Sequence, residues 1–177
     1  TTNGVISEGV TCASCGDTVA EDTTTYVADA DGAVCPHCLD YRFTYAFSYN
    51  GHEYIDNDHV IEVGGEAYDS RCADKYSIVQ LHDGDWADID NTIYVDREDE
   101  YYLDEDLASD REDRGLIVYV KSCDEYVLRR DCVWCLYNDE WIEDHDAISV
   151  LSGHVSRDDF DDYLLTLERE EVSEVGI

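Results

Sequence analysis

The chain has 177 residues, of which 44 are acidic and 11 basic, so its formal charge is −33 at pH 7. Binding to nucleic acid needs clustered Lys and Arg that displace counterions from phosphates, and this composition argues against it. No apolar run is long enough to span a membrane, and the 11% of aromatic residues argue against a disordered acidic tail. We expect a folded protein of the cytoplasm or of a viral particle.

The acidity itself has two physical interpretations. In the first, a dense carboxylate surface stays hydrated at high salt, where charge repulsion is screened. In the second, the carboxylates imitate a nucleic-acid backbone and occupy a basic cleft on a partner. Asp exceeds Glu, lysine occurs only at Lys75 and Lys121, and the arginines are scattered along the chain. This usage resembles that of halophilic proteins.

The first predicted elements are short strands whose turns carry two Cys-x-x-Cys pairs. Cys12 and Cys15 form the first pair, and Cys35 and Cys38 form the second after 19 intervening residues. Zinc binds four thiolates in a tetrahedron, and two tight turns that meet can supply them without a large core. Two disulfides or a free redox pair are the alternatives. Four sulfur ligands leave no position for water or substrate, so we expect one structural Zn²⁺ ion.

Two such pairs in this order resemble the zinc ribbon family. The resemblance covers residues 10–40 only and rests on the two Cys-x-x-Cys knuckles. It implies that each knuckle lies on a β-hairpin and that one zinc ion holds the two hairpins together.

A repeat follows the cysteine pairs along the chain. Asn50-Gly51, Gly64-Gly65 and Asp83-Gly84 lie between short runs rich in Tyr, Val and Ile, which is typical of hairpins with tight turns. The shared pattern is an apolar strand, a polar turn, an aromatic or small anchor and, about five residues later, a polar residue that opens the next strand. The anchors are Thr18, Ala33, Tyr54, Ala67, Trp86, Tyr101, Tyr126 and Trp141.

The anchors are alternately 13 to 15 and 19 to 25 residues apart, which predicts pairs of hairpins as the repeating unit. The predicted units are a zinc-ribbon-like unit at residues 8–42 and degenerate hairpin pairs at residues 43–77, 78–114 and 115–152. The predicted fold class is therefore mainly β: tandem short β-hairpins in zinc-ribbon-like repeats, followed by one C-terminal amphipathic α-helix. Chance self-similarity of a chain rich in Asp and Tyr is the alternative.

Further cysteines offer a second metal site. Cys123, Cys132 and Cys135 form a Cys-x8-Cys-x2-Cys pattern, which His145 would complete as a fourth ligand, with Asp146 or Cys72 as substitutes. The alternative is that these cysteines are small buried side chains in strands, because free cysteine is among the most buried residue types. A weaker third group would combine Cys72 with two nearby histidines.

The last predicted element is an amphipathic helix over residues 156–171. Apolar side chains recur at helical spacing at Phe160, Tyr163, Leu164 and Leu167, and Ser156 is a candidate N-cap. This face either packs on the last β unit or docks on a partner or on a second copy of the chain.

The sequence contains no recognisable catalytic motif: there is no phosphate-binding glycine loop and no nucleophile elbow. Pairs of carboxylates are too frequent in this chain to indicate a catalytic pair. The expected function is therefore that of a non-enzymatic, acidic, zinc-stabilised protein-interaction module, a scaffold or adaptor of halophilic or viral origin. One alternative is a nucleic-acid mimic that inhibits a DNA- or RNA-binding protein. Another is a structural component of a virion or other assembly, for which the chain would associate with itself.

Overall fold

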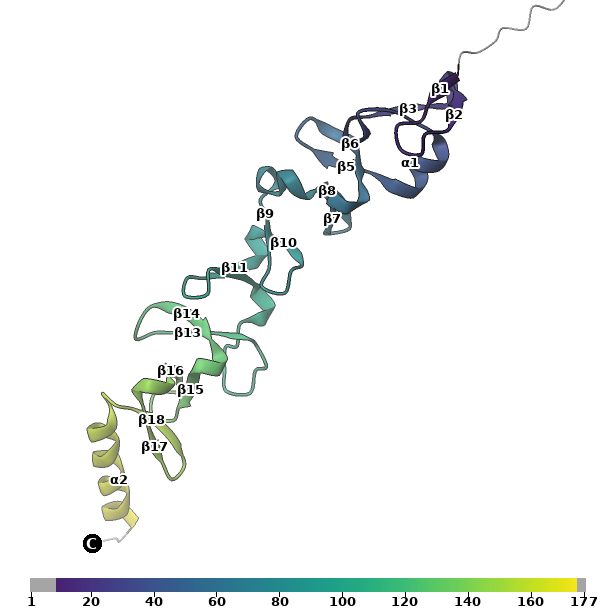
Figure 1. Cartoon of the computed structure of the whole chain (residues 1–177). Coiled ribbons are helices and arrows are strands. Elements are labelled where there is room, and N and C mark those ends of the chain that lie inside the picture. The colour runs from purple at the N-terminus through teal and green to yellow at the C-terminus, as the bar shows by residue number, and fades with distance from the viewer. Residues whose placement is uncertain (1–8, 175–177) are drawn as a thin grey trace, which may run out of the picture. The chain divides into compact units, whose positions relative to one another are not determined.

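The computed structural model of the protein describes the backbone of residues 9–174 and the side chains of residues 9–167. The chain divides into two compact units, here called unit 1 (residues 9–80 and 84–90) and unit 2 (residues 81–83 and 91–174) (Figure 1). Both are built from short antiparallel hairpins, which confirms the mainly β fold class with a C-terminal helix. The division into four hairpin-pair units stays a prediction.

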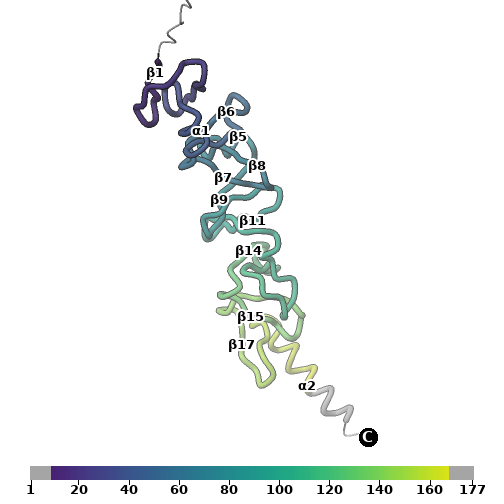
Figure 2. The backbone as a smooth tube through the Cα atoms, turned by 90° about the vertical axis from the view of Figure 1, so that its right-hand side faces the viewer, coloured from purple at the N-terminus to yellow at the C-terminus, as the bar shows by residue number. Residues whose placement is uncertain are grey.

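Unit 1 contains five hairpins and one short α-helix, with 3₁₀ helices in several of its connections. Its elements are β1 (Gly9–Thr11), β2 (Thr18–Ala20), β3 (Thr25–Val27), β4 (Gly32–Val34), α1 (Pro36–Arg42), β5 (Phe43–Ser48), β6 (Gly51–Asp56), β7 (Val60–Val63), β8 (Glu66–Asp69), β9 (Ile78–Gln80) and β10 (Trp86–Asp88). Two of the hairpins join into a sheet of order β6-β5-β8-β7, in which β5 and β8 are parallel. These four strands gather together in Figure 2 as they do in Figure 1.

Unit 2 continues with the same hairpin motif. Its elements are β11 (Thr92–Val95), β12 (Glu100–Leu103), β13 (Ile117–Val120), β14 (Glu125–Leu128), β15 (Cys132–Cys135), β16 (Glu140–Glu143), β17 (Ala147–Val150), β18 (Gly153–Ser156) and α2 (Phe160–Glu174). The last two hairpins form a sheet of order β16-β15-β18-β17, with β15 parallel to β18. This topology repeats that of the four-stranded sheet in unit 1.

Every anchor of the sequence pattern lies in the second strand of an antiparallel hairpin. In four hairpins the anchor faces an aromatic residue directly across the strand pair. The ring centroids are 4.9 to 5.4 Å apart in the pairs Tyr45–Tyr54, Tyr94–Tyr101, Tyr119–Tyr126 and Trp134–Trp141. Such cross-strand pairs contribute to hairpin stability beyond the area they bury.

The spacing from anchor to next strand corresponds to a short 3₁₀ turn. Seven of the eight anchor-bearing strands run directly into a 3₁₀ helix; β4 instead leads through Cys35 into α1. Asp56, Asp69 and Asp88 close three of these turns, because each carboxylate accepts a hydrogen bond from the backbone N–H two residues on. Many of the acidic residues therefore have a local structural role.

Three of the four hairpin turns of unit 2 use Asp in a conformation that usually favours glycine. Asp99, Asp124 and Asp139 have φ of 57°, 60° and 51°, and each directly precedes the second strand of its hairpin. Asp tolerates this left-handed region better than most residues. Tyr94 and Tyr119 each donate a hydroxyl hydrogen bond to the turn aspartate of their own hairpin.

Three small clusters of buried side chains serve as cores. The cluster in unit 1 contains Cys12, Val27, Val34, Cys35, Cys38 and Phe43. Two clusters in unit 2 contain Ala108, Val118, Val120, Val127, Cys132 and Trp141, and Val95, Tyr102, Ile117 and Leu128. Because each cluster is small, the stability of each unit depends on a few large side chains and, in unit 1, on the cysteines.

Gly115 allows the loop before β13 to approach the backbone of the preceding segment. A Cβ atom at this position would lie 2.3 Å from the carbonyl oxygen of Asp106 and 2.5 Å from the amide nitrogen of Ala108. We expect Gly115→Ala to lower the free energy of unfolding by about 1–3 kcal/mol, because rigid backbone atoms must move apart. Urea unfolding followed by circular dichroism measures the loss. Leu116→Ala, at the exposed next position, should cost less than about 1 kcal/mol, and equal losses would contradict this explanation.

The C-terminal helix α2 begins at Phe160, four residues later than predicted. Ser156 instead ends β18, and residues 157–159 form a turn, in which the N–H of Asp158 donates a hydrogen bond to Ser156 Oγ at 3.3 Å. The Tyr163 ring packs edge-on against Tyr137, whereas Leu164 and Leu167 are 42% and 40% exposed. The first turn thus packs on unit 2, and docking of the remaining face on a partner stays a prediction. Within the described part of the chain, no helix has the length and apolarity to cross a membrane.

Candidate metal centre

The first cysteine pair lies on a tight turn between β1 and β2. The N–H of Cys12 donates to the carbonyl of Asp17 at 2.8 Å, and the N–H of Gly16 donates to the carbonyl of Cys12 at 2.9 Å. Gly16 has φ of 82°, a left-handed conformation that needs glycine or a residue that tolerates strain. This turn brings the sulfur atoms of Cys12 and Cys15 to one side.

The second cysteine pair opens a helix. The expectation that this pair also lies on a hairpin is wrong, because Cys35 is the N-cap of α1 and Cys38 belongs to its first turn. Pro36 at the start of the helix has a φ suited to that position and lacks an N–H that would need a partner. The Ala13 N–H donates to the carbonyl of Ala33 at 2.8 Å, which fixes the two knuckles against each other.

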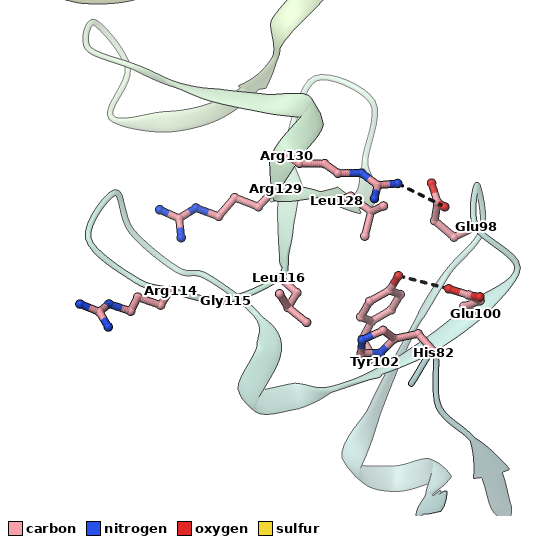
Figure 3. Close-up of a pocket in the computed structure, with 10 residues that line it drawn as sticks. All are labelled: His82, Glu98, Glu100, Tyr102, Arg114, Gly115, Leu116, Leu128, Arg129 and Arg130. Atoms are coloured by element: carbon pink, nitrogen blue, oxygen red, sulfur yellow. Dashed lines mark hydrogen bonds and ion pairs between the residues drawn. The ribbon is translucent and has the colours of Figure 1, made fainter. Parts of the chain in front are cut away.

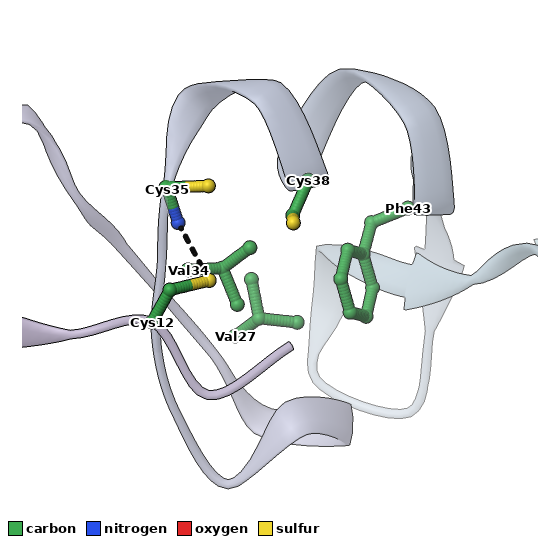
Figure 4. Close-up of a cluster of buried hydrophobic side chains, with 6 residues drawn as sticks. All are labelled: Cys12, Val27, Val34, Cys35, Cys38 and Phe43. Atoms are coloured by element: carbon green, nitrogen blue, oxygen red, sulfur yellow. Dashed lines mark hydrogen bonds between the residues drawn. The ribbon is translucent and has the colours of Figure 1, made fainter. Parts of the chain in front are cut away.

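The four sulfur atoms of Cys12, Cys15, Cys35 and Cys38 all lie within 4.8 Å of one another. Those of Cys15 and Cys35 are 4.0 Å apart. Four Zn–S bonds of about 2.3 Å at tetrahedral angles require sulfur separations of about 3.8 Å, so this cluster fits zinc with little adjustment. All eight cysteines are free, so the structure does not support the disulfide alternative. In Figure 4 the sulfurs of Cys12, Cys35 and Cys38 face a common space beside Val27, Val34 and Phe43.

Hydrogen bonding favours the thiolate form of one cysteine in this cluster, Cys12. The N–H of Cys35 donates to Sγ of Cys12 at 3.3 Å, and this bond is the main reason that the pKa of Cys12 is lowered to about 6. Burial, by contrast, raises the pKa of Cys38. A bound divalent cation would stabilise all four thiolates together, and the N–H···S bond orients one of them.

Of the cysteines outside this cluster, Cys72, Cys132 and Cys135 are buried and Cys123 is half-buried. Sγ of Cys72 donates to the carbonyl of Asp69 at 3.3 Å, and burial raises the pKa of Cys72. Burial also raises the pKa of Cys132 to about 12, and Cys132 packs with Cys123 and Trp141. A thiol in such surroundings behaves as a small apolar side chain.

The proposed second ligand set is not brought together. Among residues 9–167, only two groups of three or more ligand atoms lie within 4.8 Å: the four N-terminal cysteines, and Glu143, His145 and Asp146. His145 therefore lies beside carboxylates, apart from the sulfurs of Cys123, Cys132 and Cys135. Glu143 is itself paired with Arg97. The weaker group of Cys72 with histidines is likewise not formed in this part of the chain.

Unit 1 also contains a groove between β3 and the hairpin β5–β6, which the sequence did not predict. It has a volume of about 300 Å³ and is lined by Tyr26, Val27, Ala28, Tyr45, His52, Glu53 and Tyr54. We call it the aromatic groove. Tyr26 and Tyr45 are 70% and 58% exposed, which is high for such large side chains. The groove is formed where β3 and the turn after it pack beside β6, a strand of a different hairpin, so no local sequence pattern indicates it.

The four clustered cysteines, each pair Cys-x-x-Cys, thus form a candidate metal centre between hairpins of unit 1. Comparison of the chain with protein-family models, curated proteins and solved structures found no match, so no family is identified for it.

Proposed function

We propose that this chain is a non-enzymatic, zinc-stabilised interaction module that binds a basic protein partner through its aromatic groove. The observation that carries the proposal is the position of exposed aromatic side chains next to a metal centre whose four sulfur ligands leave no site for a reactant. The metal centre has the ligand set of a zinc ribbon, and its first knuckle has the expected turn. Its role in this proposal is to hold the hairpins that build the groove.

A small network of hydrogen bonds and ion pairs holds together the two sides of the groove, the turn after β3 and the strand β6. The Asp29 carboxylate, on the short 3₁₀ helix Ala28–Ala30, accepts a hydrogen bond from the N–H of Asp56 at 3.0 Å. The same carboxylate pairs with Arg71 at 2.9 Å. Arg71 also pairs with Asp69 at 2.8 Å, and these contacts keep β3 beside β6. A groove fixed before binding loses less entropy when a partner is bound.

The chemistry of the groove favours a cation. Tyr45 stacks on His52, with centroids 5.4 Å apart, and is tilted against Tyr54 at 5.1 Å, so that several π faces lie close together. Glu53 adds a carboxylate, and no Lys or Arg is among the lining residues. Aromatic faces with a nearby carboxylate attract ammonium and guanidinium groups. The formal charge of −33 would also steer a basic protein toward the chain.

A lysine-rich peptide tests this proposal directly. We expect it to shift the ring resonances of Tyr26 and Tyr45 in NMR titrations. The double variant Tyr26→Leu/Tyr45→Leu keeps apolar bulk but removes both π faces, and should weaken binding about five- to thirtyfold, because each exposed cation–π contact contributes about 0.5–1 kcal/mol. A peptide with glutamate in place of lysine should not bind.

The matched control changes two tyrosines outside the groove, in Tyr94→Leu/Tyr119→Leu. These side chains are also exposed and lie in hairpins of unit 2, and their loss should leave the affinity unchanged. If both double variants bound the peptide as tightly as the unaltered chain, carboxylates alone would account for binding. That outcome would refute binding through the aromatic groove and would favour the alternative that the chain is a nucleic-acid mimic.

A further inference from the structure

A second cavity lies wholly within unit 2 and is lined by several basic side chains, although the chain as a whole is strongly acidic (Figure 3). Its volume is about 690 Å³, within the range of pockets that take small organic molecules. Three of the 11 basic residues of the chain line it, although the formal charge is −33. They are Arg114, Arg129 and Arg130. The arginines that look scattered in the sequence are therefore grouped by the fold.

Backbone contacts hold the walls of this cavity in place. The N–H of His82 donates to the carbonyl of Tyr101 at 3.0 Å, next to a parallel bridge between Leu81 and Tyr101. On the other side, the N–H of Arg129 donates to the carbonyl of Leu116 at 2.8 Å. Backbone hydrogen bonds therefore fix the position of both sides of the cavity, so its shape does not depend on side-chain conformations alone.

The middle of the cavity is flat and apolar. The rings of His82 and Tyr102 stack with centroids 4.3 Å apart and planes 14° apart. Leu116 and Leu128 line the cavity between these rings and the arginines, as Figure 3 shows. A planar apolar group could lie against this surface and bury its area there.

The arginines differ in their partners. Arg130 lies 3.9 Å from the carboxylate of Glu98, whereas Arg114 makes no ion pair or side-chain hydrogen bond within the described residues. The Arg129 guanidinium lies 5.1 Å from the ring centroid of Trp141 and donates to the carbonyl of Arg111 at 3.3 Å. No carboxylate of the described chain lies within 4.0 Å of Arg114 or Arg129. In Figure 3 both side chains extend to the same side of the cavity.

The acids of the neighbouring loop make no direct ion pair with Arg114 or Arg129, because their oxygens already accept hydrogen bonds within the loop; Arg129 acts on Asp113 only at longer range. Asp113 accepts hydrogen bonds from the N–H and the hydroxyl of Ser109, at 2.9 and 2.7 Å, and these bonds lower the pKa of Asp113. Asp110 accepts from the N–H of Glu112 at 2.8 Å. Carboxylates that close turns are held away from other partners. The loop thus keeps cationic groups at one mouth of the cavity.

We propose that this cavity binds a small organic anion that has a flat apolar body and one carboxylate or phosphate group. The body would lie on the stacked rings of His82 and Tyr102. The anionic group would meet Arg114, whose planar guanidinium suits both carboxylate and phosphate, and Arg129, which is held against Trp141, would add positive charge to the same side. Glu98 and Glu100 line the opposite side and disfavour a second negative charge there. The proposed ligand therefore carries its charge at one end.

A pair of probes of equal shape tests the charge requirement. 2-Naphthoate and 2-naphthamide differ only in the charged group, and each is titrated into the whole chain while backbone amide resonances are followed by NMR. We expect naphthoate to shift the amides of Gly115 and Leu116 in a saturable manner and to bind at least tenfold more tightly than naphthamide. Equal affinities, or no saturable shift with naphthoate, would overturn the proposal.

Two arginines of the same loop supply the variant and its control. Arg114→Gln should abolish the preference for naphthoate, and since Arg114 is exposed and lacks a partner, its replacement should not disturb folding. Arg111 is equally exposed but does not line the cavity, so Arg111→Gln should keep the preference. Unchanged circular dichroism verifies the fold of both. If both variants lost the preference equally, or neither did, the assignment of this cavity would be wrong.

Discussion

Removal of the metal should unfold the N-terminal hairpins of unit 1 and leave unit 2 folded. The cluster in unit 1 that packs around Val27 and Phe43 includes three of the four cysteines, so little apolar core remains there without the ion. Structural zinc contributes apparent binding energies on the order of 10–16 kcal/mol in small domains, far more than such a core could supply. Chelation followed by NMR should show loss of amide dispersion for residues 9–42, while resonances of β11–β18 persist.

Cys15→Ser is the sharpest single substitution for this test. Cys15 is the exposed member of the cluster, so its change removes a ligand without opening a cavity. We expect the purified chain to hold one zinc ion and the variant to retain much less, as measured by elemental analysis. Cys123→Ser, which changes a cysteine outside the cluster, should keep one ion. A full equivalent of zinc in Cys15→Ser, or two ions in the unaltered chain, would contradict a single four-cysteine site.

Trp141→Ala should cause the largest loss of stability in unit 2. Trp141 is 8% exposed, packs edge-on against Trp134 at 5.3 Å and lies beneath the Arg129 guanidinium. Replacing a buried Trp by Ala typically costs about 3–5 kcal/mol, from lost transfer energy and the cavity left behind. Urea unfolding of unit 2, followed by NMR, measures the change.

Trp86→Ala provides the comparison, because Trp86 holds an equivalent anchor position in unit 1 but is only half-buried and faces Gln80 across its hairpin. We expect this change to cost about 1–2 kcal/mol. If the two substitutions lowered the free energy of unfolding equally, the anchor position alone would determine the loss of stability, and packing around the aromatic pair would not. A loss below about 1 kcal/mol for Trp141→Ala would argue against a stabilising role for the pair.

The parts of this fold that sequence reasoning predicted are those encoded by neighbouring residues. A Cys-x-x-Cys pair places two sulfurs on one turn whatever the rest of the chain does, so the cluster follows from spacing. The anchors follow in the same way from turn residues and alternation in short strands. The helix α1 was missed, although Pro36 directly after Cys35 is a signal for a helix start. The hairpin β17–β18 was missed because the position equivalent to the anchor is occupied by His154, which faces Ser149 and does not match the Tyr, Trp or small residues of the pattern.

The features that were not predicted depend on contacts between distant residues. The parallel pairings of Phe47 with Tyr68 and of Cys135 with His154 join hairpins into sheets, and nothing in the local pattern specifies them. The same limit applies to the cavity of unit 2. Arg114 and Arg129 are 15 positions apart and are brought to one cavity by the bond between Arg129 and Leu116. Charge counts along a chain do not reveal such grouping.

The pairing of each strand with its neighbour in sequence has a consequence for how the chain reaches its native state. Strands of every hairpin are separated by short connections, so most contacts close small loops at low entropic cost. Proteins with such low contact order fold faster than other β proteins, whose strands pair over long distances. Strong mutual repulsion among the carboxylates would oppose an early collapse of the whole chain. Each hairpin can form from neighbouring residues, so folding can proceed without such a collapse.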